Sequence, residues 1–170
     1  WRCYQGNRFS EDLDFIIPKN IPTIEELFNN FQTKGFEIIK KRITENSIYS
    51  TLELNRTQVR FEAIFGVKKF TLIDYETLNG QRIPIYSLTP TEVIEEKINA
   101  YLNRMLIRDL YDIFFMLKYI TNKDGIKNVL KKLLTKFKPP LDEKNLKSLI
   151  LIGTIPTSSQ IKEYIERWAK

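Results

Sequence analysis

The chain has 170 residues, enough for one compact domain with a core or for a domain with a small helical appendage. Its 42% hydrophobic and 28% charged residues are typical of a globular protein, and no apolar run reaches the roughly 20 residues of a membrane-spanning helix. One cysteine excludes an internal disulfide framework, and the lack of histidine excludes His-based acid–base catalysis and His-ligated zinc. We therefore expect a cytoplasmic protein whose catalysis would depend on carboxylates, other polar side chains or an oxygen-bound metal.

The net charge of +6 comes entirely from the C-terminal part of the chain. Residues 1–122 contain 16 basic and 16 acidic residues, whereas residues 123–170 contain 11 basic and 5 acidic ones. A basic segment on a neutral body indicates an acidic partner, with nucleic acid as the first candidate. A solvated, lysine-rich helical surface is the simpler explanation of the same composition.

The first half of the chain predicts a mixed α/β region. A strand is expected from Asp12 to Ile17, followed by a helix that ends at Gly35. Thr23 would cap this helix, and Glu26 would complete a capping box. Four β-branched and aromatic runs separated by short polar turns predict an antiparallel meander, with strands at 36–43, 47–54, 58–65 and 70–75.

The second half predicts helices. Thr89 with Pro90 is typical of a helix start, and apolar periodicity predicts helices at 91–103, 107–121, 125–137, 143–151 and 158–169. We expect an α+β fold with a mixed or antiparallel sheet and flanking helices in a domain at 1–88, followed by an all-helical domain at 89–170.

Two acids lie one residue apart near the start of the chain. In a strand, Asp12 and Asp14 project from the same face, and carboxylates this close repel each other unless a cation intervenes. Mg²⁺ prefers oxygen ligands and is usually bound by one or two carboxylates together with substrate phosphates. The pair therefore indicates a site for Mg²⁺ (or Mn²⁺) and a triphosphate. On these residues alone, a turn at Asp12 and an ion pair between Asp14 and Arg8 explain the pattern equally well.

A second group of charged residues lies on the predicted helices. Lys97 and Arg104 are seven residues apart and share a helix face, where they could bind phosphate oxygens. Asp109 and Asp112 share another local face. Asp109 is equally well explained by a structural ion pair with Arg104 or Arg108. For Lys97, surface ion pairs with neighbouring glutamates are the alternative to a role in the site.

Two stretches, R8-F-S-E-D-L-D-F15 and E92-V-I-E-E-K-I-N-A-Y-L-N-R-M-L-I-R-D-L-Y-D-I113, resemble the two motifs of the nucleotidyltransferases related to the AbiEii toxins of bacterial abortive-infection and toxin–antitoxin systems. The resemblance covers about Arg8 to Leu117 and implies the polymerase-like nucleotidyltransferase fold. In that family a Gly-rich segment that contacts the nucleotide phosphates comes before the first motif. Here it would precede Trp1, so we expect the sequence to be an internal fragment, with poor catalysis without that segment.

The resemblance also implies roles for the acidic residues. Asp12 and Asp14 would hold the metal. Glu62, an acid in an apolar strand and on the side opposite Phe61, would be the third carboxylate of the site, although an outward-facing charge paired with its neighbours is the alternative. Glu53 is a weaker candidate for the same role.

Of the remaining implied site residues, Asp112 would be catalytic and the others would bind the nucleotide. Lys97 and Arg104 would steady the triphosphate, Asp112 and Asp109 would belong to the active site, and Ser10 would hydrogen-bond a phosphate or stabilise a turn. The activity would be transfer of a nucleotide from an NTP to an RNA acceptor, such as the end of a tRNA, with the basic C-terminal helices contacting the RNA. An antitoxin protein is an expected partner.

Two other functions remain open from the sequence. The chain could be a non-catalytic module that binds nucleic acid or a partner protein on a decayed nucleotidyltransferase scaffold. It could also be a glycosyltransferase, since D-x-D occurs in enzymes that use sugar nucleotides, although that class needs a nucleotide-sugar domain before the motif.

Overall fold

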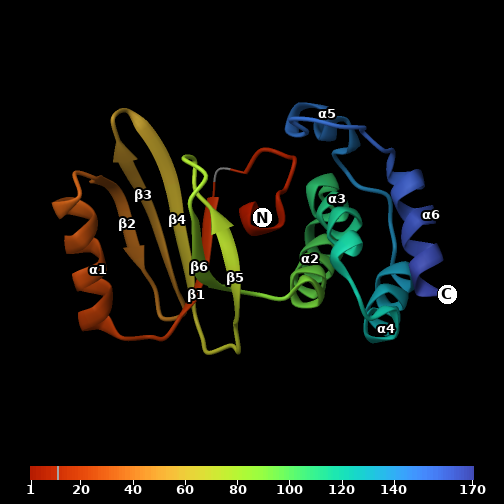
Figure 1. Ribbon diagram of the computed structural model, residues 1–170, viewed down its shortest axis with the longest axis horizontal. Coiled ribbons are helices and arrows are strands. Elements are labelled where there is room, and N and C mark those ends of the chain that lie inside the picture. Colours follow the sequence, from red (N-terminus) through yellow and green to blue (C-terminus); the bar gives the residue numbers. More distant parts are fainter. Residues whose placement is uncertain (11) are drawn as a thin grey trace. The chain divides into compact units, whose positions relative to one another are not determined.

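The structure, a computed structural model, describes residues 1–10 and 12–170, without the side chain of Arg2. These residues form two compact units, one of Ser10–Lys69 and one of Trp1–Phe9 with Phe70–Lys170 (Figure 1). The predicted α+β fold is confirmed, since a four-stranded mixed sheet and a two-stranded sheet precede a helical C-terminal part. The domain boundary at residue 88 stays a prediction.

The unit Ser10–Lys69 consists of one helix and the four-stranded sheet. The strand order is β1-β4-β3-β2, with β1 parallel to β4 and the other pairs antiparallel. The chain crosses from β1 through helix α1 to the far edge and returns through two hairpins, so β4 is an inner strand beside β1. The elements are β1 Asp12–Ile17, α1 Ile21–Thr33, β2 Glu37–Ile43, β3 Ser47–Leu54 and β4 Thr57–Phe65.

Strand alternation divides this sheet into an apolar and a polar face. Phe61 and Ala63 of β4 are buried with Ile48 of β3 against Ile24 and Phe28 of α1. The residues between them on β4 point to the opposite, open face, as the sequence pattern predicts. Burial of the apolar face stabilises the unit, and the open face is available for polar chemistry.

Helix α1 begins two residues before the predicted cap. The side chain of Asn20 accepts a hydrogen bond from the Thr23 amide, and Pro22 lies in the first turn. The predicted cap at Thr23 is therefore wrong, because a proline needs no amide partner in the first turn and so fits inside the helix start. The helix ends before Gly35, whose φ of +89° suits a glycine.

The predicted fourth strand of the meander does not join the main sheet. It forms β5, Thr71–Glu76, which pairs antiparallel with β6, Arg82–Ser87, in a separate two-stranded sheet. The prediction was wrong because β1 and β3 already occupy both sides of β4. Strand β6 is not predicted from the sequence, because Pro84 interrupts its β-branched pattern.

The helices follow in the predicted order. Thr89 caps α2 with a capping box, and the helices α2 and α3 are separated at Met105, which has a φ of +52°. The predicted helix at 143–151 is reduced to a 3₁₀ turn and one α-helical turn, because Ile150 is extended and bridges to Arg8. The elements are α2 Pro90–Arg104, α3 Ile107–Met116, α4 Lys123–Thr135, α5 Leu146–Leu149 and α6 Ser158–Ala169, with 3₁₀ turns η1 Arg2–Tyr4, η2 Leu117–Tyr119 and η3 Glu143–Asn145.

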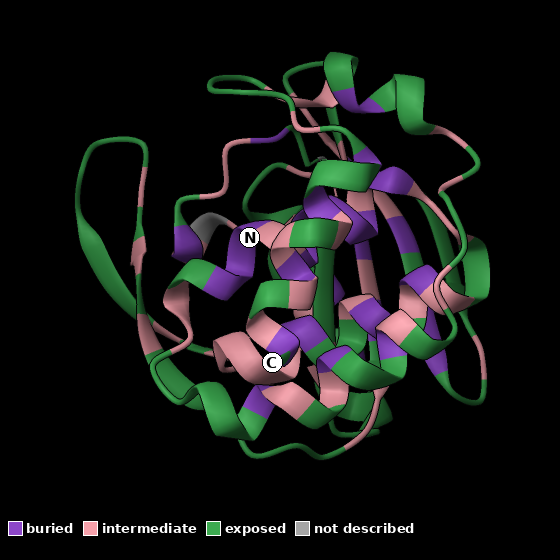
Figure 2. Ribbon diagram, turned by 90° about the vertical axis from the view of Figure 1, so that its right-hand side faces the viewer, coloured by how far each residue is buried: buried purple, intermediate pink, exposed green. Residues whose placement is uncertain are grey.

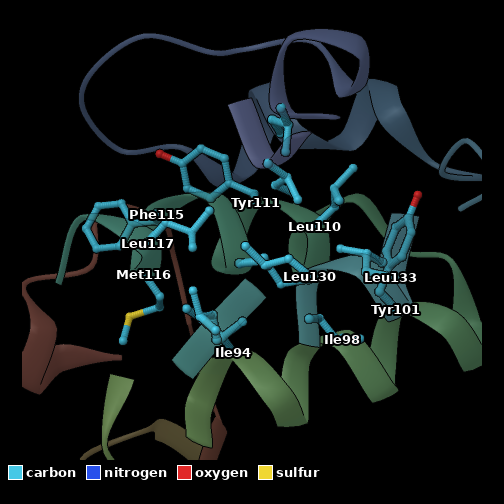
Figure 3. Close-up of a cluster of buried hydrophobic side chains, with 14 of the residues drawn as sticks. Ile94, Ile98, Tyr101, Leu110, Tyr111, Phe115, Met116, Leu117, Leu130 and Leu133 are labelled. Atoms are coloured by element: carbon cyan, nitrogen blue, oxygen red, sulfur yellow. The ribbon is translucent and has the colours of Figure 1, made fainter. Parts of the chain in front are cut away.

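The helical core is formed where these helices face one another. Figure 3 shows Ile94 and Ile98 of α2 beside Leu110 of α3 and Leu130 and Leu133 of α4, and all five side chains are buried. Helices α2, α4 and α6 have buried residues on one side and exposed residues on the other (Figure 2), whereas α3 has no exposed residue. Among the described residues, no helix is both long enough and apolar enough to cross a membrane.

Candidate functional site

Three of the predicted site acids lie together on the open face of the four-stranded sheet. In the register of the parallel pair, Asp12 lies opposite Arg60 and Asp14 lies opposite Glu62. Residues paired in this way point to the same face, and Asp12 and Asp14 share that face because they are two residues apart. We call Asp12, Asp14 and Glu62 the acidic corner.

Asp12 has a cationic neighbour in the acidic corner. Its Oδ1 lies 2.6 Å from Nε of Arg60, a side chain that is 48% exposed. The contact is an ion pair and not a hydrogen bond. Oδ1 of Asp12 is buried, and it accepts no hydrogen bond from any described residue. The charge of the Asp12 carboxylate is therefore compensated by Arg60, while its Oδ1 lacks a hydrogen bond from the described residues.

The acidic corner has the carboxylate oxygens expected of a magnesium site in which the substrate supplies the remaining ligands. Within the described parts of the chain, no three His, Cys, Asp or Glu residues gather closely enough to hold a metal ion by themselves. Mg²⁺ usually takes only one or two protein carboxylates, and phosphates and water supply the other ligands. Asp12 and Asp14 offer two such carboxylates, and the buried Oδ1 of Asp12 lacks a hydrogen bond. The residues present fit the metal.

The open face continues from the acidic corner to exposed aromatic and cationic residues that were not among the predicted site residues. The strand register pairs Glu62 with Tyr49, and Tyr49 with Arg42. Lys40 shares the face of Arg42, both are exposed, and Tyr49 is 46% exposed. Alternation within S47-I-Y-S-T-L-E-L54 signals that Tyr49 faces away from the core. Its position beside Glu62 depends on strand pairing, which the sequence pattern does not contain.

The other predicted site residues form an ion network in the unit that contains the helices. Asp112 accepts hydrogen bonds from Nε and Nη2 of Arg8, each at 2.6 Å, and its Oδ2 lies 2.9 Å from Nζ of Lys97. Asp109 accepts two hydrogen bonds of 2.7 Å from Arg104 and lies 3.9 Å from Lys97. Both aspartates are fully buried. We call these five residues the ion network.

The electrostatics of the ion network favour its cations. Burial alone would lower the pKa of the Arg8 guanidinium, but the hydrogen bonds to Asp112 and the negative charges of Asp112 and Asp109 raise that pKa. Three cations face two carboxylates, which leaves one excess positive charge. Lys97 and Arg104 are 28% and 44% exposed, so their cationic ends reach the surface while the acids do not.

Local geometry explains why these residues meet. The left-handed residue Met105 ends α2, and the amide of Ile107 at the start of α3 donates a 2.6 Å hydrogen bond to Asp142. This sharp turn brings Asp109 and Asp112 back against α2. The amide of Phe9 donates a hydrogen bond to the carbonyl of Leu149 at 2.7 Å, within an isolated β-bridge between Arg8 and Ile150. This bridge holds the backbone of Arg8 in place.

The structure decides between some of the alternatives that the sequence left open. Arg8 pairs with Asp112, so it is not the partner of Asp14 that one interpretation required. Asp109 pairs with Arg104, as the structural interpretation predicts. Ser10 is exposed just before β1. Residue Glu11 of the first motif lies outside the described residues.

A mixed sheet with three carboxylates on one face, followed by a helical part, has the features expected of a nucleotidyltransferase. Comparison with known families agrees, because the family described as "Nucleotidyl transferase AbiEii toxin, Type IV TA system" matches residues 1–167. The chain belongs to this family, and the resemblance inferred from the two motifs is confirmed. A search of curated proteins found no match.

Proposed function

We propose that this nucleotidyltransferase uses Mg²⁺ to transfer a nucleotide from an NTP to an RNA acceptor, such as the end of a tRNA. Family membership supplies the reaction class. The observation that supports the location of the chemistry is the register of β1 and β4, which places Glu62 beside Asp14 and two residues from Asp12 on one face. The cytoplasm is the compartment that we propose, with an antitoxin protein as the partner.

The acidic corner would perform the transfer. Asp12 and Asp14 would hold the metal, which when bound neutralises charge on the phosphates as pyrophosphate departs. Arg60 is half exposed and would leave Asp12 for the phosphates. The acceptor hydroxyl oxygen forms a bond to the α-phosphorus, the bond to the bridging oxygen of pyrophosphate breaks, and Glu62 takes the hydroxyl proton. With no histidine in the chain, a carboxylate is the natural base.

Nucleotide binding would involve the cations of the ion network. Lys97 and Arg104 are partly exposed and would contact phosphate oxygens, with Lys97 as a point charge and Arg104 through its planar guanidinium. Asp112 and Asp109 are fully buried and bonded to these cations. Their contribution would be to position Lys97 and Arg104. Ser10 is exposed before β1 and would donate a hydrogen bond to a phosphate.

The test is incubation of the full-length protein with labelled NTPs, Mg²⁺ and total RNA. Asp12→Asn, Asp14→Asn and Glu62→Gln should each lower label transfer at least about 100-fold. The matched control is Glu53→Gln on β3, because Glu53 is also an acid in this sheet but accepts a hydrogen bond from Gln58 at 2.7 Å. It should keep activity within about twofold of the unchanged protein.

A second readout does not depend on turnover. Calorimetric binding of NTP with Mg²⁺ should be weakened in Asp12→Asn and Asp14→Asn and should be unaffected in Glu53→Gln. Intact protein that transfers no label and binds RNA but no NTP–Mg²⁺ would instead support a non-catalytic binding module. Full activity in Asp12→Asn would contradict the proposal outright.

A further inference from the structure

A cationic pocket of about 630 Å³ lies in the helical unit, between the C-terminal part of α2 and the end of α4. It is lined by Lys132, Lys136 and Lys138 together with Asn99 and Asn103. The three lysines are exposed, and no acidic residue is among the described residues that line the pocket. We call it the lysine pocket. Its volume is within the range of about 300–1,000 Å³ that is usual for ligand sites.

The segment that supports the lysine pocket is held in place by hydrogen bonds to α2. The hydroxyl of Tyr101 donates to the carbonyl of Lys138 at 2.6 Å, and the amide of Leu141 donates to the carbonyl of Met105 at 2.9 Å. Tyr101 is buried, stacks on Phe137 and lies next to Leu133 in the core (Figure 3). Because the backbone beneath the lysines is already ordered, binding an anion here costs little additional backbone entropy.

The lysine pocket is separate from the ion network. Asn99 and Asn103 are one helical turn apart, and at 3.6 residues per turn they lie on the side of α2 opposite Lys97 and Arg104. The cations of the ion network are bound to buried aspartates, whereas the lining of the pocket contains no acid among the described residues. An anion in this pocket would therefore add to nucleotide binding at the ion network and would not replace it.

We propose that the lysine pocket binds phosphate groups of the RNA acceptor, an inference that rests on the proposed function. Lysine is a point-charge binder of phosphate, and phosphate contacts dominate the affinity of proteins for nucleic acids. The three lysines of the pocket lie in residues 123–170, the segment that contributes the whole net charge of +6, so their field attracts a polyanion. The amides of Asn99 and Asn103 both donate and accept hydrogen bonds, which suits ribose 2′-hydroxyls better than the carboxylates of an acidic protein.

The experiment compares two triple variants of the full-length protein, each in the Asp12→Asn background so that no transfer occurs. One variant is K132Q/K136Q/K138Q, and the matched control is K131Q/K144Q/K147Q, whose lysines are also exposed in the same unit. Each set of three substitutions lowers the net charge by three, from +7 in the Asp12→Asn background to +4. Thermal unfolding by circular dichroism establishes that both fold.

Affinity for tRNA is then measured by fluorescence anisotropy between 50 and 200 mM salt. The pocket variant should lose at least about tenfold in affinity, and its salt slope should fall by about 2, since each phosphate contact contributes about 0.7. The control should lose less than about threefold. N99A/N103A keeps the charge and should reduce the preference for RNA over DNA of the same sequence.

Three results would overturn the inference. In the first, both triple variants lose the same affinity, so net charge and not the pocket matters. In the second, the pocket variant binds tRNA normally but loses binding to polyglutamate, which indicates an acidic protein partner. In the third, K132Q/K136Q/K138Q with Asp12 unchanged loses affinity for free NTP–Mg²⁺ as strongly as for tRNA, which indicates the nucleotide. If intact protein transfers no label but the pocket variant alone loses tRNA, the proposed function fails and the pocket assignment stands.

Discussion

Replacing Asp112 with asparagine tests whether the ion network holds the helical unit together. Asp112 is fully buried, accepts two 2.6 Å hydrogen bonds from Arg8 and lies 2.9 Å from Lys97. The substitution leaves three cations facing one carboxylate, and Arg8 is only 7% exposed. Removing one partner of a buried ion pair costs about 3–5 kcal/mol, because the remaining charge stays buried without compensation.

Urea unfolding followed by tryptophan fluorescence measures this loss of stability in the structural unit that contains the ion network. Both tryptophans of the chain, Trp1 and Trp168, belong to the unit that contains the ion network. At about 2–4 °C per kcal/mol for a chain of this size, the melting temperature should fall by about 6–20 °C. The matched control is Asp124→Asn, because Asp124 is 88% exposed and pairs with Lys127 at 3.0 Å. It should cost less than about 1 kcal/mol.

A double variant separates the unpaired charge from lost packing. Arg8→Met with Asp112→Leu removes both members of the pair, and it should destabilise the protein less than Asp112→Asn alone. The reasoning is refuted if Asp112→Asn costs less than about 1 kcal/mol. It is also refuted if the double variant costs the sum of the two single variants, since paired residues should not be additive.

Three further outcomes follow from the structure. Burial raises the pKa of Tyr101 to about 12. The hydrogen bond to Lys138 should make the unchanged protein about 1 kcal/mol more stable to unfolding than Tyr101→Phe. In urea titrations this difference should be complete below pH about 10 and should fall as the pH approaches about 12. Gly6→Ala would place a Cβ 2.0 Å from the Trp1 ring, and it should cost about 1–3 kcal/mol and shift tryptophan emission in a Trp168→Phe background. Thr89→Ala removes a capping box and should cost about 0.5–2 kcal/mol in the same unfolding assay.

The helical half of the chain was predictable because its signals are local. Thr89 with Pro90 fixes the start of α2, and apolar periodicity gives α4 and α6 within two residues. Strands β1 to β5 were recognised for the same reason, and the predicted antiparallel pairs β2–β3 and β3–β4 are confirmed. The pairs β1–β4 and β5–β6 were not predicted. Residues 70–75 follow β4 in sequence and still pair with β6, because the parallel strand β1 occupies the side of β4 that they would need.

The candidate site shows the same division. Alternation along β1 and β4 determines from sequence alone that Asp12 and Asp14 share a face and that Glu62 points away from Phe61. Likewise, the spacing of Asp109 and Asp112 determines that both lie on one side of α3. These are properties of one element at a time, so they follow from the amino-acid order.

Only the tertiary structure decided which of these elements meet. The crossover through α1 makes β1 parallel to β4 and sets Asp14 opposite Glu62, and the alternative registers of two strands have the same local pattern. Arg8 reaches Asp112 across 104 residues of chain. Pairing over such a separation depends on how the whole chain packs, because burial of Asp112 is tolerated only where a cation from elsewhere compensates its charge.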